Sequence, residues 1–171
     1  MVGRSLLGNA MAGVLLLALA LCGCESDLGD GKAADAGDAG KGDAVLSFTA
    51  KSSVQKAKFL VDPLKGAVYG NLFLTEDVTV AGPINGAEQF GSIDVLGLDL
   101  QGEGKVDGAF TTPKLAPGNY TFLGFFDVDD NGATSHDPDP GDPVTLAITN
   151  HFIIEAGKTT AYTVTFDLVY N

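Results

Sequence analysis

The chain has 171 residues, 22 acidic side chains against ten basic ones, and a formal net charge of −12. Such an acidic chain lacks the positive surface that nucleic acid binding requires, and it is repelled by anionic phospholipid, so any membrane attachment must be covalent. The two cysteines both lie near the N-terminus. The rest of the sequence therefore has no thiol for a disulfide framework, a catalytic thiolate or a cysteine-ligated metal.

Residues 1–23 have the layout of a secretory signal peptide, with Arg4 followed by an apolar run that ends at Leu21 and is too short to cross a bilayer comfortably. The sequence Leu21-Cys22-Gly23-Cys24 then resembles the lipobox of bacterial lipoprotein precursors. The resemblance implies cleavage before Cys24, whose sulfur and new amine would carry acyl chains such as palmitate. Cys22 fits less well because bulky Leu21 would occupy the small-residue position. The alternative is an ordinary signal peptide with two incidental cysteines.

Residues 25–44 consist almost wholly of Gly, Ala, Asp and Lys. Because this composition buries too little apolar area to offset the entropy of ordering, we expect a solvated acidic tether after Cys24, with a reach of about 25 Å. Glu25 stands where the inner-membrane retention signal of the enterobacterial kind has Asp, which favours the outer membrane of the cell envelope. The predicted organisation is thus a signal peptide at 1–23, a lipidated tether at 24–44 and one folded domain at 45–171.

Short segments rich in Val, Ile, Phe, Tyr and Thr follow, separated by Gly, Pro, Asn and Asp. Many alternate apolar with polar residues, and no window of a dozen residues carries a helical apolar stripe. The pattern predicts an all-β domain, an antiparallel sandwich or barrel of seven or eight strands. The expected strands are Val45 to Ala50, Ala57 to Val61, Ala67 to Thr75, Ser92 to Leu100, Tyr120 to Val128, Val144 to Ile148, His151 to Ile154 and Thr160 to Tyr170.

Three motifs occur in order within residues 65–170: a G-x-V-x-G strand at Gly66 to Gly70, a G-x-F at Gly108 to Phe110, and an L-x-P-G-x-Y at Leu115 to Tyr120. In this order they resemble the carboxypeptidase-regulatory-like and prealbumin-like domains. The resemblance implies a Greek-key β-sandwich that acts as a non-catalytic module. Pro117-Gly118 makes a tight turn, and Leu115 and Tyr120 are expected to face the core, with Phe110 packed beneath.

Residues 125–143 read FFDVDDNGATSHDPDPGDP and carry six acidic side chains without a lysine or arginine. Alternate residues Asp127, Asp129 and Asn131 have the oxygen-ligand spacing of a calcium loop, and Gly132 supplies the turn. The twelfth position is Pro138, so Asp137 or Asp139 must replace the usual acid. The alternative is a solvated acidic turn. The predicted calcium ligands are Asp127, Asp129, Asn131, the carbonyl of Ala133, Asp137 and Asp139.

Catalysis finds little support in the sequence. His136 and His151 are the two histidines, no pair has zinc-ligand spacing, and no serine lies in a nucleophile elbow. Carboxylate pairs among Asp94, Asp99, Asp127 and Glu155 are expected by chance in an acidic sandwich. We therefore expect no enzyme, but a membrane-anchored binding or structural module with a protein or carbohydrate partner. The alternatives are an envelope hydrolase or carbohydrate-binding protein using the Asp127 loop, and a subunit of a surface assembly docking through an exposed sheet edge.

Overall fold

The computed structural model describes residues 38, 40–57 and 63–171. These residues belong to one compact unit, Asp35–Asn171. The predicted signal peptide, Cys24, most of the tether and residues 58–62 lie outside the described residues. Within the described part, no helix has the length and apolar character needed to cross a membrane.

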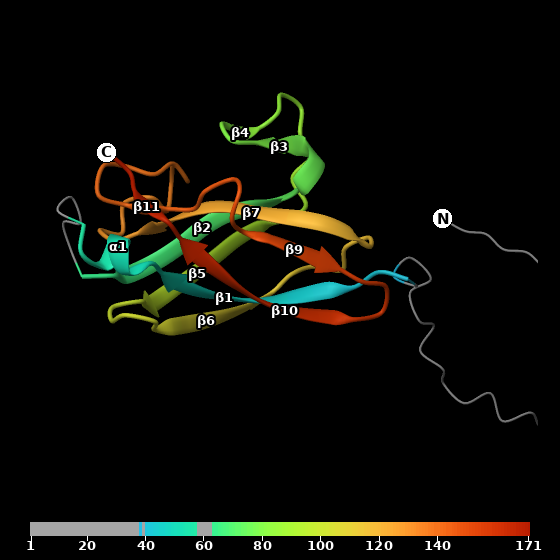
Figure 1. Cartoon of the computed structure of the whole chain (residues 1–171), viewed down its shortest axis with the longest axis horizontal. Coiled ribbons are helices and arrows are strands. Elements are labelled where there is room, and N and C mark those ends of the chain that lie inside the picture. Colours follow the sequence, from blue (N-terminus) through green and yellow to red (C-terminus); the bar gives the residue numbers. More distant parts are fainter. Residues whose placement is uncertain (1–37, 39, 58–62) are drawn as a thin grey trace, which may run out of the picture. The chain divides into compact units, whose positions relative to one another are not determined.

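Two sheets form the body of the molecule (Figure 1). The smaller sheet has the order β10-β1-β6, with bounds Thr159–Phe166, Asp43–Ala50 and Val106–Thr111. The larger sheet has the order β11-β8-β7-β2-β5, with bounds Leu168–Val169, Pro143–Val144, Gly118–Asp127, Lys65–Leu74 and Ser92–Asp99. Strand β9 (His151–Ile154) also pairs with β7. The remaining elements are a short helix α1 (Ser52–Gln55), a 3-10 turn η1 (Thr75–Asp77) and a hairpin of β3 (Val78–Thr79) and β4 (Gly82–Pro83).

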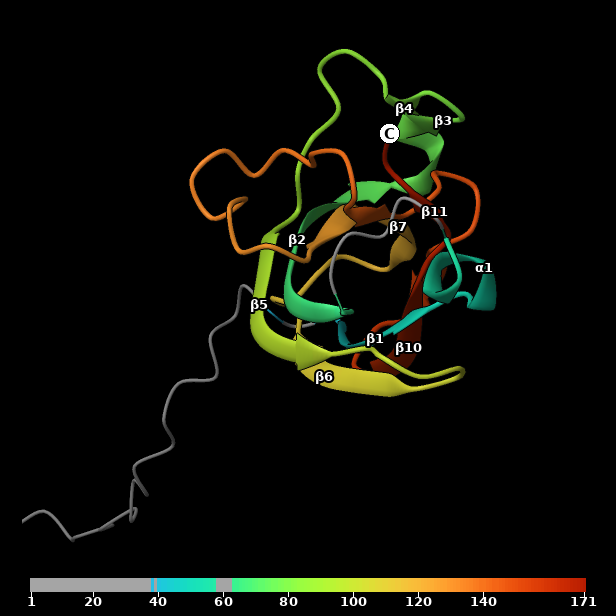
Figure 2. The same ribbon diagram turned by 90° about the vertical axis from the view of Figure 1, so that its left-hand side faces the viewer.

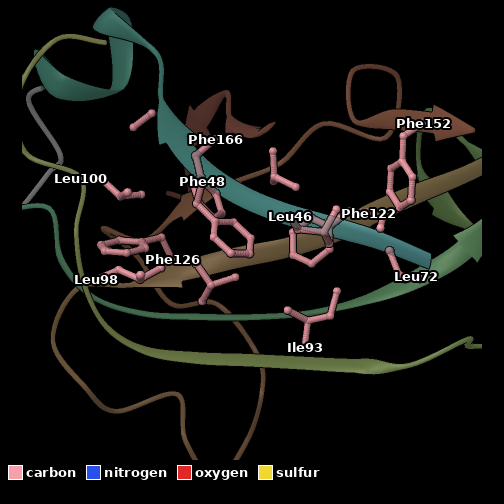
Figure 3. Packing of buried hydrophobic residues seen from close by; sticks show 14 of the residues in the cluster. Leu46, Phe48, Leu72, Ile93, Leu98, Leu100, Phe122, Phe126, Phe152 and Phe166 are labelled. Carbon is pink, nitrogen blue, oxygen red and sulfur yellow. The ribbon is translucent and has the colours of Figure 1, made fainter. Parts of the chain in front are cut away.

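The core lies between the two sheets, because alternate residues of each strand point inward (Figure 3). Phe48 from the smaller sheet contacts Phe122 of the larger sheet edge to face, with ring centroids 6.1 Å apart. Gly70 and Gly124 are paired on β2 and β7, and a Cβ built on Gly70 would lie 2.5 Å from the Phe122 ring. These two glycines therefore leave the space in which the Phe122 ring sits.

The all-β expectation is confirmed, and seven strands of the described part have four residues or more. The wholly antiparallel arrangement is wrong at one pair, because β1 and β10 run parallel over eight residue pairs. Strand β1 begins at Asp43, two residues before the expected start, and β6 was not expected as a strand. Of the segment expected at 57–61, Ala57 is irregular and the rest lies outside the described residues. The strand expected from Val144 to Ile148 is reduced to β8.

The turn before β7 has the expected packing. Leu115 and Tyr120 are buried in the core, and Phe110 packs against it while partly exposed. The Tyr120 hydroxyl donates a 3.0 Å hydrogen bond to the carbonyl of Ala116, four residues earlier. This bond fixes the entry angle of β7, the strand that leads into the acidic loop.

Between β2 and β6 the chain makes a long excursion. It forms η1 and the β3–β4 hairpin, returns through β5, and β5 then curves towards β6 of the other sheet (Figure 2). In Figure 1 the hairpin and the loop after β7 rise from the same side of the larger sheet. The outer face of this sheet thereby lies between two protruding segments.

Candidate metal centre

The acidic loop, residues 128–142, leaves β7 after Asp127 and returns at β8. At its base, a small apolar cluster on the outer face of the larger sheet joins Ala67, Tyr69 and Phe125. The His136 ring lies over Tyr69 with centroids 5.0 Å apart. The loop is thus packed onto the sheet at this point.

Asp127 is fully buried at the end of β7. Its Oδ2 accepts a 2.9 Å hydrogen bond from the backbone N–H of Gly132, and its Oδ1 accepts a 3.3 Å bond from that of Asn131. A Cβ at position 132 would lie 2.9 Å from the Phe125 ring and 3.1 Å from Asp127 Oδ2. Glycine is required there so that the turn can close over the carboxylate.

Asp142 is also fully buried, at the other end of the loop. Its two oxygens accept hydrogen bonds from the N–H groups of Val128 (3.2 Å) and Asp139 (3.1 Å). Burial raises the pKa of Asp142 to about 6, against the partial relief from these two donors, and the charges of Asp139 and Asp127 add to the rise. The carboxylate therefore lies where its own negative charge is unfavourable.

Asp127, Asp129 and Asp142 form a cluster in which one carboxylate oxygen from each lies within 4.8 Å of the others. Asp129 is exposed, and partial removal from water together with the carboxylates of Asp139 and Asp127 raises its pKa. Carboxylate oxygens converging in this way are the ligands that hard divalent cations prefer. We call these three residues the acidic cluster.

Asn131 links the cluster to Asp139. Its amide nitrogen donates to Asp129 Oδ2 at 2.9 Å and to Asp139 Oδ2 at 2.6 Å. A half-turn of the amide would place its oxygen on the same side, where it would serve as a ligand beside the carboxylates. Asn131 and Asp139 are therefore next to the acidic cluster and able to extend it.

The predicted ligands thus separate into groups. Asp127 and Asp129 belong to the acidic cluster, and Asn131 and Asp139 adjoin it. Asp137 lines a groove on the outer face of the sheet, and Ala133 is exposed on the loop. Asp142 was missed by the sequence analysis because it lies beyond the twelve-residue pattern. The signal that could have found it is the position of an acid between Gly141 and Pro143, at the start of an apolar segment.

The two histidines lie on different parts of the fold, His136 on the acidic loop and His151 at the start of β9. His151 Nδ1 lies 2.7 Å from the Thr121 hydroxyl, and Thr121 is fully buried, which keeps its oxygen from a substrate. Asp99 pairs with Lys65 at 3.5 Å and with Lys105 at 3.0 Å. Its charge is thereby compensated away from the loop.

No protein-family model matches the chain, and no curated protein matches it either.

Proposed function

We propose that the protein is a lipid-anchored envelope lipoprotein whose β-sandwich is a non-catalytic binding or structural module, stabilised by calcium at the acidic cluster. The observation that supports a bound ion is the convergence of three carboxylates, two of them fully buried, whose oxygens lie within 4.8 Å of one another. Buried carboxylates without a cation nearby are costly, and a bound divalent ion removes that cost.

Calcium fits the donor set better than other metals. The candidate ligands are all oxygens, with neither cysteine nor histidine in the acidic cluster. Calcium takes six to eight oxygens in flexible geometry, whereas magnesium requires a near-ideal octahedron and zinc favours nitrogen and sulfur. An irregular loop with Asn131, Asp139 and backbone carbonyls beside the cluster suits calcium. The ion would then hold the loop in one conformation.

Calorimetric titration with calcium tests this role, using residues 24–171 with Cys24→Ser so that neither the predicted signal peptide nor an acyl chain is present and no detergent is needed. We expect saturable heat and a raised melting temperature for this protein, and loss of both in Asp127→Ala and Asp129→Ala. Glu155→Gln, which removes an exposed acid elsewhere, is the matched control and keeps both. Absence of heat and of any gain in melting temperature in the parent chain would leave only an acidic turn.

We also propose that the sandwich is prealbumin-like with Greek-key connections. This is supported by the burial of Leu115 and Tyr120 on either side of the Pro117-Gly118 turn and by the hydrogen bond from Tyr120 to Ala116. Superposition of an experimental structure on a solved prealbumin-like domain is the test. A different strand order over residues 65–170 would refute the assignment.

The anchor is proposed at Cys24, with the outer membrane as its location. The support is the lipobox-like Leu21-Cys22-Gly23-Cys24 and the residue Glu25 after it. Replacing Cys24 with Ser should move the protein from the membrane fraction to the soluble fraction, while Cys22→Ser leaves it in the membrane. Unchanged partitioning of the Cys24 variant would contradict the anchor. Density separation of the two membranes tests the location.

A further inference from the structure

A groove of about 550 Å³ lies on the outer face of the larger sheet, next to the acidic loop. Its floor is formed by β2 and β7, one wall by the β3–β4 hairpin, and the opposite wall by residues 136–138 of the loop and residues 144–147 after it. Figure 1 shows the two protruding segments on the same side of the sheet. This volume is within the range of sites that hold small molecules.

Part of the surface inside the groove is apolar. The aromatic rings of its floor, Tyr69, Phe73 and Phe125, are each at most 5% exposed, so their faces are covered. Val80 of the hairpin is 85% exposed, and Leu123 on the floor is half-buried. Two further rings of the lining stay open, since Tyr170 is 45% exposed and His136 is exposed. A ligand would therefore contact both aliphatic side chains and ring faces, and a cation is attracted to the face of a tyrosine.

The charges that line the groove are negative. Asp94 on β5 and Asp137 on the loop are both exposed and line it. Among the described residues, no lysine or arginine belongs to its lining, and His136 is its one imidazole. Burial raises the pKa of the Tyr69 phenol in the floor, and the carboxylates of Asp127, Asp130 and Asp94 add to the rise. The groove therefore lies in a negative potential that attracts cations and repels anions.

We propose that this groove binds a small organic ammonium cation with an aliphatic body, its charge held by Asp94 and Asp137 and its apolar part held between the hairpin and the loop. Carboxylates accept charge-assisted hydrogen bonds from an ammonium group, and the apolar side chains of the lining lose contact with water when the chain enters. Neither Asp94 nor Asp137 belongs to the acidic cluster, but one wall of the groove is part of the loop that the cluster closes, so the calcium concentration is kept constant in the test.

Three probes with six-carbon chains separate charge from shape: n-hexylammonium, 1-hexanol and hexanoate. Each is titrated into residues 24–171 carrying Cys24→Ser, at fixed calcium concentration, and followed by amide chemical shifts in NMR spectra. We expect saturable shifts centred on Asn71, Leu123 and Ala147 for hexylammonium. Its affinity should exceed that of hexanol by about two- to thirty-fold, since each exposed carboxylate contributes about 0.2 to 1 kcal/mol, and hexanoate should bind most weakly.

Two variants test the location. Asp94→Asn/Asp137→Asn should bring hexylammonium down to the affinity of hexanol, while Glu103→Gln/Glu155→Gln, which removes the same charge from surfaces outside the groove, should leave it within about twofold. Ala147→Trp fills the groove and should abolish the shifts for all probes, with the melting temperature confirming that it folds. Equal affinity for hexylammonium and hexanol in the parent chain, no saturable shift for hexylammonium, or binding unchanged by Ala147→Trp would each overturn the proposal.

Discussion

Asp142→Asn is the substitution that distinguishes most sharply between a buried charge and a buried polar group. In the parent protein the Asp142 carboxyl is fully buried and accepts bonds from two backbone N–H groups, those of Val128 and Asp139. The asparagine side chain has nearly the same shape but no charge, and it has one acceptor oxygen instead of two. It therefore removes the cost of the charge and leaves one of the two donors without a partner.

The sign of the effect depends on pH. The folded-state pKa of Asp142 is about 6, above the value near 3.8 for a solvated carboxyl, so the folded protein favours the protonated form. Ionisation costs no stability below about pH 4, and the cost grows as pH rises from about 4 to about 6. The gap of roughly two pH units corresponds to about 3 kcal/mol at neutral pH. Against this, the unpaired N–H in the variant costs about 1 to 2 kcal/mol.

Urea unfolding in the presence of a chelator measures the balance. At pH 7 we expect Asp142→Asn to be more stable than the parent by about 1 to 2 kcal/mol, and at pH 4 less stable by about 1 to 2 kcal/mol. Calcium at a hundredfold excess over its dissociation constant should stabilise the parent by about 2.7 kcal/mol and the variant much less. Equal destabilisation of the variant at both pH values would refute the reasoning, because it would mean that Asp142 carries no unfavourable charge.

Five further substitutions probe the fold by urea unfolding. Asp167→Ala should cost about 2 to 3 kcal/mol, since the buried carboxylate accepts two hydrogen bonds and pairs with Lys51 at 2.5 Å. Lys51→Met should cost a similar amount, because it leaves the buried Oδ1 of Asp167 with neither a cation nor a hydrogen bond; a loss under about 0.5 kcal/mol in Lys51→Met would contradict this. Tyr120→Phe should cost about 1 kcal/mol through its lost hydrogen bond, and an unchanged midpoint would show that water replaces the bond. Gly70→Ala should cost about 2 to 3 kcal/mol because the new Cβ meets an aromatic ring at 2.5 Å, while Gly118→Ala, whose nearest contact is 3.5 Å, should cost under about 1 kcal/mol; similar losses in both would refute the packing argument.

The sequence was informative wherever apolar residues alternate. Strands β2, β5 and β7 lie close to their expected positions. Each is rich in β-branched, aromatic or other large apolar residues and is bounded by turn residues, which is the pattern used to predict strands. Strand β6 was missed because its only large apolar residues are Val106 and Phe110, and because Gly108 in its centre has a φ of 76°. An alternation pattern cannot survive such an interruption.

Strand order is a different kind of information. The parallel pairing of β1 with β10 joins residues 116 positions apart, such as Leu46 and Tyr162, and nothing in either strand's own pattern specifies that partner or its direction. The third residue of the acidic cluster, Asp142, is hard to predict from sequence for the same reason. Asp127 and Asp129 are close in sequence, but Asp142 joins them only because the loop closes where β8 pairs with β7 at Phe125.

Strand β1 lies between two neighbours, with β10 parallel to it on one side and β6 antiparallel on the other. The chain that precedes β1 leads back towards Cys24, so a pull from that side acts along the strand axis. Both ladders of β1 are then loaded in shear, and the hydrogen bonds of its eight residue pairs with β10 share the force instead of opening one after another. A force applied to the chain before β1 would thus be resisted by the strand of the smaller sheet that has two hydrogen-bonded neighbours.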